Sequence, residues 1–364
     1  MLFRSVALFN PSSGTCPVFQ SERDLAINRQ IYRAGQHICI SEGRRFGEID
    51  FLGELFNMTR DSRLFEAQPD GESEYLPLYE AKCIHQFDHR YASQNGPDFC
   101  EVASDRKQDP DCRMVPRSWV LCPEVKKRLA KRVYRSNWMC GFRSVSSPTN
   151  ERTSIVSVFP LSAVGNSINL MLGLSASEAL LLTANANSLC FDFTCRQKMS
   201  GMNLNIWIMK QLPAIPLSTY NQPAACTGAP LKDWVAKRAL ELVYTAWDVR
   251  PFAEDLGHSG PPYRWDDDRR FLIRCELDAL YFRLYGLSRD EADCILDTFP
   301  IVRRKDEHQF GEYRTKRMIL EIYDAMAEAE RTGVPYQTRL DPPPADPRVA
   351  HSPSTAGSVP VQRS

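Results

Sequence analysis

Residues 83–89 concentrate side chains that can do chemistry, since Cys83, His85 and His89 all belong to metal-ligand types. A zinc site would need a second ligand pair at a recognisable spacing, and the sequence offers none. Asp88 beside His89 has the composition of a general base, but no nucleophile or acid partner can be placed from the sequence. Polar side chains on a loop or at a strand edge are therefore the favoured interpretation.

Asn10 and Pro11 open a second polar stretch, Asn-Pro-Ser-Ser-Gly. Methylation of the exocyclic amine of adenine uses an Asn side chain and a prolyl carbonyl as acceptors, with an aromatic ring stacked on the extruded base. The second proline and the aromatic residue of such an Asn-Pro-Pro-aromatic loop are missing here. The sequence also lacks a glycine-rich strand–turn–helix that would approach S-adenosylmethionine closely. We therefore interpret Asn10-Pro11 as a turn.

Basic and amide side chains gather in three short segments, and such side chains can contact the phosphates and base edges of DNA. The first segment holds, at helical spacing, Lys126, Lys127, Arg128, Lys131, Arg132 and Arg135. The others are Asn150 with Arg152, and Arg196 with Gln197 and Lys198. Each segment alone is best explained as a solvated surface. Because several segments lie within one mixed α/β region, DNA binding becomes as favoured a hypothesis as a solvated surface.

The overall charge gives no general attraction to nucleic acid, because 45 basic residues match 45 acidic residues in the 364-residue chain. Any DNA contact must therefore come from local patches. The 12 cysteines include no Cys-x-x-Cys pair, which favours reduced thiols. The most apolar run, residues 168–189, is interrupted by Ser, Glu and Asn, and we find no signal peptide. We expect a cytoplasmic protein that does not span a membrane.

The elements that must position these side chains indicate an α+β fold. Helical periodicity occurs in three parts of the chain, namely residues 21–35, 175–201 and 231–333. Two capping boxes mark helix starts, Ser175 with Glu178 and Ser288 with Glu291. β-rich runs stand at residues 153–160 and 204–216, on either side of the helix predicted for residues 175–201.

Several long stretches carry a resemblance to a known family, among them LFNPSSGTCPVFQSERD, YLPLYEAKCIHQFDHRYA, TNERTSIVSVFPLSAVGNS and LLLTANANSLCFDFTCRQKMSGMNLNIWIMKQLP. In this order they resemble the C-terminal part of restriction–modification adenine methyltransferases, in which a TaqI-like specificity domain follows the methylase module. The resemblance implies a junction segment at 1–74, a mixed α/β target-recognition domain at 75–220 and a helical region at 221–335. The Pro- and Ser-rich residues 336–364 are expected to form a disordered tail.

By this resemblance, the chain is the DNA sequence-recognition portion of a site-specific, adenine-specific DNA methyltransferase of a restriction–modification or defence system. Its partner would be double-stranded DNA. S-adenosylmethionine is the cofactor of the full-length family, but the module that binds it is absent, so this chain is expected to hold no cofactor or metal and to be inactive alone. The side chains whose types suit DNA contact are Lys82, His85, Arg90, Arg143, Asn150, Arg152, Arg196, Gln197 and Lys198.

Two alternatives stay open. The chain could be a methylase subunit that is active only with its catalytic half supplied in trans by a separate methylase chain. It could also be a remnant that does not bind DNA, or a protein-interaction scaffold. By the resemblance, the helices beyond residue 231 are expected to brace the mixed domain rather than to contact bases, whereas in a scaffold the helical end would dock on a partner.

Overall fold

The computed structural model describes residues 8, 9, 19, 21–38, 49–69, 71–224 and 226–353. Its central element is a four-stranded antiparallel sheet in the order β2-β10-β7-β8. The strands are β2 (Asp50–Leu52), β7 (Trp138–Arg143), β8 (Val156–Pro160) and β10 (Ile168–Leu172). Strand β8 confirms the β-rich run predicted at residues 153–160.

Apolar side chains occupy both faces of the central sheet, because both faces are covered by other parts of the protein. Along β7, Cys140 and Phe142 pack toward the helices, whereas Met139 packs toward a second sheet. Gly141 lies between them, where a Cβ atom would come within 2.9 Å of the carbonyl oxygen of Asn169 on β10. Glycine therefore allows β7 and β10 to approach each other closely.

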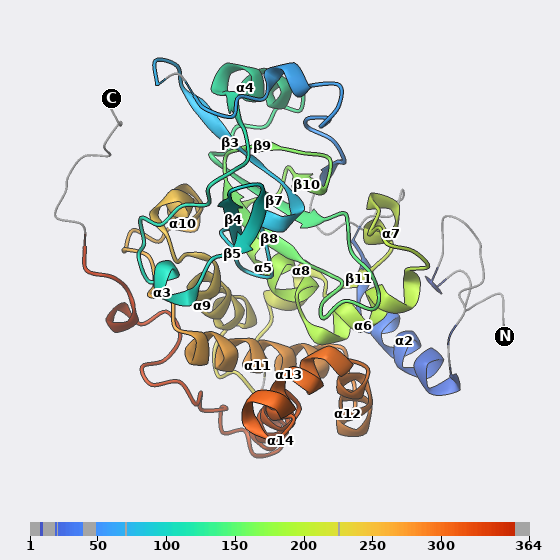
Figure 1. Cartoon of the computed structure of the whole chain (residues 1–364). Coiled ribbons are helices and arrows are strands. Elements are labelled where there is room, and N and C mark those ends of the chain that lie inside the picture. The colour runs from blue at the N-terminus through green and yellow to red at the C-terminus, as the bar shows by residue number, and fades with distance from the viewer. Residues whose placement is uncertain are drawn as a thin grey trace.

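A three-stranded sheet, β6-β3-β9, covers one face of the central sheet (Figure 1). Its strands are β3 (Tyr75–Tyr79), β6 (Trp119–Leu121) and β9 (Ala163–Val164). Strand β3 pairs antiparallel with β6 and parallel with β9. The remaining elements of this half are α4 (Cys122–Ala130), the hairpin β4 (Ala92–Asn95) and β5 (Asp98–Glu101), α3 (Ser104–Lys107), η1 (Ser62–Leu64) and η2 (Ala81–Cys83).

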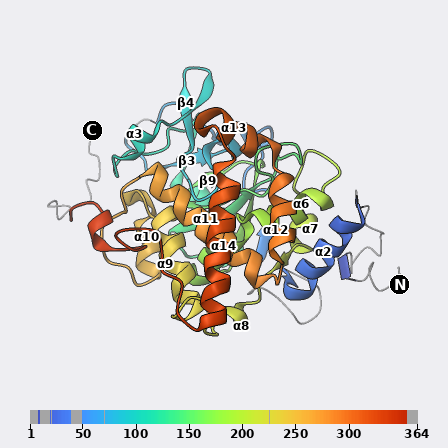
Figure 2. The same cartoon turned by 90° about the horizontal axis from the view of Figure 1, so that it is seen from below.

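Helices cover the other face of the central sheet, with α5 packed between β8 and α9, while α14 lies across α11 (Figure 2). The helices are α2 (Glu22–Ala34), α5 (Ala176–Ala186), α6 (Leu189–Lys198), α7 (Ile206–Lys210), α8 (Leu217–Tyr220), α9 (Leu231–Val243), α10 (Arg250–Asp255), α11 (Asp267–Leu284), α12 (Arg289–Asp297), α13 (Pro300–Phe310) and α14 (Arg314–Thr332). The short segments are η3 (Trp247–Val249) and η4 (Pro347–Val349). The predicted α+β class with a helical C-terminal region is confirmed. One hydrophobic core joins α2, α5 and α6 to α9, α11 and α14, so it crosses the boundary predicted at residue 220.

The single helix predicted at residues 175–201 is wrong, because α5 ends at Ala186 and α6 begins at Leu189. Between them, the side-chain amide of Asn187 accepts from the backbone N–H of Val156 and donates to its carbonyl, both at 2.9 Å. A side chain that pairs with a strand in this way competes with helix continuation. Ser188 then caps α6. The capping boxes at Ser175 and Ser288 are both confirmed.

Residues 204–216 were expected to be β-rich, but most of the ordered structure there is helical. Helix α7 takes up Ile206–Lys210, with Ile208 and Met209 buried and Trp207 exposed. Only the short strand β11 (Pro213–Ala214) follows, and it pairs with β1 (Gln36–His37). Helix α7 is little more than one turn long, so its buried residues are too few to show helical periodicity in the sequence.

The disorder predicted from residue 336 onward does not hold for residues 336–353, which pack on α9 and α11. Glu276 on α11 accepts hydrogen bonds from the hydroxyls of Tyr336 and Thr338, at 2.9 and 2.6 Å. Glu241 on α9 accepts from the backbone N–H of Ala345 at 2.7 Å. Composition alone indicated disorder because the segment has no apolar period. The buried carboxylates that order it belong to distant helices.

Two further predictions concern residues that the structure does not describe, namely the turn at Asn10-Pro11 and the tail over 354–364. The short helix expected at residues 21–35 is confirmed as α2, which Ser21 caps. Among the described residues, no helix has the length and apolar character needed to cross a membrane.

Candidate functional site

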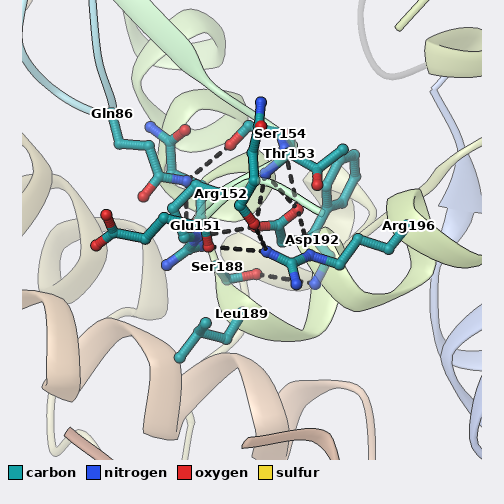
Figure 3. Close-up of polar contacts among 12 residues, drawn as sticks. Gln86, Glu151, Arg152, Thr153, Ser154, Ser188, Leu189, Asp192 and Arg196 are labelled. Atoms are coloured by element: carbon teal, nitrogen blue, oxygen red, sulfur yellow. Dashed lines mark hydrogen bonds and ion pairs between the residues drawn. The ribbon is translucent and has the colours of Figure 1, made fainter. Parts of the chain in front are cut away.

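Asp192 on α6 joins two of the predicted DNA-contact residues through a fully buried carboxylate (Figure 3). It accepts hydrogen bonds from Nε of Arg152 at 2.8 Å and from the backbone N–H groups of Thr153 and Ser154, each at 3.0 Å. Nε of Arg196, one helical turn along α6, lies 3.7 Å away. We call these five residues the Asp192 hub. Because a buried charge is tolerated only when it is paired and hydrogen-bonded, the hub has a fixed geometry.

The hub holds the exposed loop 147–151. Nη2 of Arg196 donates to the backbone carbonyls of Asn150 and Glu151, at 2.7 and 2.8 Å, while its guanidinium stacks 4.2 Å from the ring centroid of Phe299. The side chains of Thr149 and Asn150 are exposed. A polar loop therefore projects into solvent from a rigid, charge-paired base.

A cleft opens beside the hub, between the segment around His85 and helices α11 and α13. It has two adjoining compartments of about 290 and 390 Å³. Both compartments are lined by the same six residues, His85, Gln86, Glu151, Asp267, Arg274 and Lys305. We call it the α11 cleft. Asp267, Arg274 and Asp278 follow one another at whole-turn spacings on α11, which places them on the helix face that lines the inner compartment.

Burial controls the charges inside the α11 cleft. Desolvation, helped by Arg143, lowers the pKa of His85 to about 3, so its imidazole is neutral, and it lies against Tyr91 at 4.6 Å between ring centroids with the rings tilted by 31°. Desolvation raises the pKa of Asp278 to about 6, although this carboxylate accepts the backbone N–H of Leu189 at 2.7 Å. The cleft therefore contains a carboxylate that takes up a proton just below neutral pH.

The raised pKa of Asp278 predicts a pH-dependent stability. The folded state binds this proton more tightly than the unfolded chain, so the free energy of unfolding falls as the pH rises from about 4 to about 6. Asp278→Asn removes the titration and keeps a carbonyl oxygen for Leu189. Relative to the wild type, we expect the variant to gain ~2 kcal/mol between pH 4 and pH 8. Urea denaturation at both pH values measures the gain, and an equal stability difference at the two pH values would contradict the shift.

Arg90 is the predicted DNA-contact residue that the structure assigns to a different role, because its side chain is 0% exposed. Its guanidinium donates to four backbone carbonyls, at 2.7 to 2.9 Å, those of Lys107, Asp109, Cys112 and Thr245. This burial leaves no surface for a DNA contact. Arg90 instead fastens residues 107–112 to the segment that follows α9.

The other predicted residues lie apart from the hub or beside it. Lys198 donates to the carbonyl of Phe9 at 2.5 Å, and desolvation lowers the pKa of its amine to about 8. Arg143 donates from Nε to the carbonyl of Ile84 at 2.8 Å. Lys82 is exposed on η2, and Gln197 is half-buried on α6. Of the nine predicted residues, Asn150, Arg152 and Arg196 are brought together, with His85 in the adjoining cleft.

The basic segment at residues 126–135 is largely neutralised by acidic partners. Arg128 makes a bidentate pair with Asp61 at 2.9 and 2.8 Å, and Arg132 pairs with Asp50 at 3.2 Å. The segment begins on α4, which lies at the top of the molecule in Figure 1, away from α6. These cations therefore do not extend the hub surface.

The residues around His89 form buried polar pairs. Nε2 of His89 lies within hydrogen-bond distance of a carboxylate oxygen of Asp248, at 2.8 Å, and the ammonium of Lys107 forms an ion pair with Asp88 at 2.7 Å. Within the described part of the chain, no three His, Cys, Asp or Glu side chains are arranged to hold a metal ion. The pairing accounts for Asp88 and His89 as buried polar side chains.

The prediction missed the cleft residues Arg274, Asp278 and Lys305, which stand on helices expected only to brace the domain. The charges on one face of α11 were the signal that the sequence offered. The other side of the cleft, however, is formed by the segment around His85, almost 200 positions earlier in the chain. The cleft and the loop offer ionic and hydrogen-bonding groups for recognising a polar ligand. Searches of family models, curated proteins and solved structures found no match to this chain.

Proposed function

We propose that this chain is the DNA sequence-recognition portion of a site-specific adenine DNA methyltransferase. The observation that carries the proposal is the loop 147–151. The Asp192 hub fixes this loop beside the α11 cleft, in which the guanidinium of Arg274 has no ion-pair partner among the described residues. Reading bases requires polar side chains held rigidly at a surface. Asn150 suits this role because an Asn side chain can pair bidentately with adenine.

Different residues would do different tasks in this proposal. Arg152 and Arg196, both committed to Asp192, position the loop instead of touching DNA. Thr149 and Asn150 are exposed and would face the base edges. Cations at the mouth of the α11 cleft would hold phosphates, which fixes the register of a protein on a duplex without conveying sequence. The resemblance of the sequence to the methyltransferase family supplies the reaction that this recognition would direct.

The test is a selection from a pool of random duplexes, followed by sequencing of the bound fraction. We expect the wild-type protein to enrich one short sequence, with binding that weakens steeply between 50 and 200 mM salt, as expected for ~5 or more phosphate contacts. Asn150→Ala should relax the preference at one base pair, with a loss of ~1–3 kcal/mol in discrimination.

Asn95→Ala is the matched control, because Asn95 is also exposed but lies on the β4–β5 hairpin. It should leave the enriched sequence unchanged. Absence of any enriched sequence, together with binding that is indifferent to salt, would reject the proposed function.

A further inference from the structure

We infer that the α11 cleft binds a phosphate group and that Arg274 is its principal ligand. The identification of the carrier as DNA rests on the proposed function, whereas the phosphate site itself rests on the geometry of the cleft. A phosphate ester of the DNA backbone and a free phosphate compound share this chemistry, and the experiment below separates them.

Arg274 differs from the other cations of the cleft in having no committed partner. Arg152 is paired with Asp192 at 2.8 Å, Lys305 with Glu151 at 2.5 Å and Arg314 with Asp268 at 3.0 Å. Within the described part of the chain, the side chain of Arg274 makes no hydrogen bond and no ion pair within 4 Å. Its side chain lines both compartments of the cleft, so one guanidinium is available where they meet.

Arg274 is exposed to solvent at the mouth of the cleft, yet the protein around it lowers its pKa by desolvation. Arg152 lowers that pKa further, whereas Asp278 and Glu151 raise it. An arginine stays charged under these conditions. An anion that enters the cleft would therefore gain a partly desolvated, unshared cation, where ionic hydrogen bonds are stronger than in water.

The cleft favours the phosphate over the base of a nucleotide. Two aromatic residues that could stack on a base line the outer compartment, and the ring of Tyr91 is already covered by His85, at 4.6 Å between ring centroids. The other aromatic residue is Trp265. Both Lys107 and Arg270 already lie over its ring, at 4.6 and 3.6 Å from the centroid. The planar fork of Arg274 matches two oxygens of a phosphate. Lys305 lines the same cleft. It would supply a second positive charge when its ammonium contacts both Glu151 and the phosphate.

The test measures two ligands on purified full-length protein, namely inorganic phosphate by calorimetry and a labelled 20-base-pair duplex by fluorescence anisotropy. Arg274→Met keeps the length of the side chain but removes its donors. We expect it to weaken phosphate binding at least ~10-fold and to reduce the salt slope of duplex binding by ~1. Arg289→Met is the control, because Arg289 is exposed on α12 and pairs with Asp324; it should change neither quantity more than ~2-fold.

The outcomes separate the two proposals. Loss of phosphate binding in Arg274→Met supports the cleft site, and an unchanged duplex affinity in that variant would assign a free phosphate compound as the occupant. Phosphate binding without any duplex binding would reject the DNA function while the site stands. Equal phosphate and duplex affinities in the wild type and in a folded Arg274→Met would overturn the site. If that variant does not fold, Asp278→Asn decides, because removing this negative charge should tighten phosphate binding at pH 7.5 and an unchanged affinity would overturn the inference.

Discussion

Replacing Asp192 with alanine is expected to lower the free energy of unfolding by ~4 kcal/mol, because it leaves buried cations without their partner. Arg152 and Arg196 would face each other across the vacated site, and the N–H groups of Thr153 and Ser154 would lose their acceptor. Loop 147–151 would then be held only through its remaining contacts. Urea denaturation followed by tryptophan fluorescence measures the loss, and limited proteolysis within the loop measures its release.

Asp324→Ala is the matched control for this change. Asp324 also pairs with an arginine, Arg289, but both side chains are about half exposed, at 49% and 51%. Exposed pairs contribute ~0–1 kcal/mol, so the control should be close to the wild type. An Asp192→Ala variant as stable as the control would mean that the hub does not fix the loop.

The second large effect is expected from Arg90→Met. Methionine fills similar space but donates no hydrogen bond, so four backbone carbonyls lose their donor at once, two of them in fully buried hydrogen bonds. We expect a loss of ~3–5 kcal/mol, since each unsatisfied buried carbonyl carries a desolvation penalty. The segment around residues 107–112 should also open, which amide hydrogen exchange detects as faster exchange there than in β7.

Arg331→Met provides the comparison, because Arg331 is 72% exposed and pairs only with Glu328 one turn away. It should change the unfolding free energy by less than ~0.5 kcal/mol. If Arg90→Met lost DNA affinity while keeping full stability, Arg90 would have to be a contact residue after all.

Local patterns in the sequence predicted the parts of the fold that depend on neighbouring residues. The capping boxes at Ser175 and Ser288 and the strand β8 are set by side chains within a few positions of one another. The break at Asn187 was not predictable in the same way, because its amide is used by Val156, a residue on another element. At Asn187, the hydrogen bonds to Val156 outweighed the helical periodicity of the sequence.

The candidate site shows the same limit. Residue type drew attention to Arg152 and Arg196, but not to the carboxylate that unites them. Arg90 has the same type and a buried structural role, which only the four distant carbonyls disclose. Arg274 is missing from the sequence-based set. The cleft forms where α11 packs beside the segment around His85, and no local pattern in the sequence predicts that contact.

The ordered segment at residues 336–345 bears on how the protein matures during synthesis. Glu241 and Glu276 stand on helices that leave the ribosome many residues earlier, yet some of their hydrogen-bond donors belong to this late segment. Until it emerges, both carboxylates must keep water where the finished protein has hydroxyl and amide groups. A nascent chain that stops before residue 336 would therefore leave to water the carboxylate oxygens that bind Tyr336, Thr338 and Ala345, although Arg238 and Arg269 already pair with the two carboxylates.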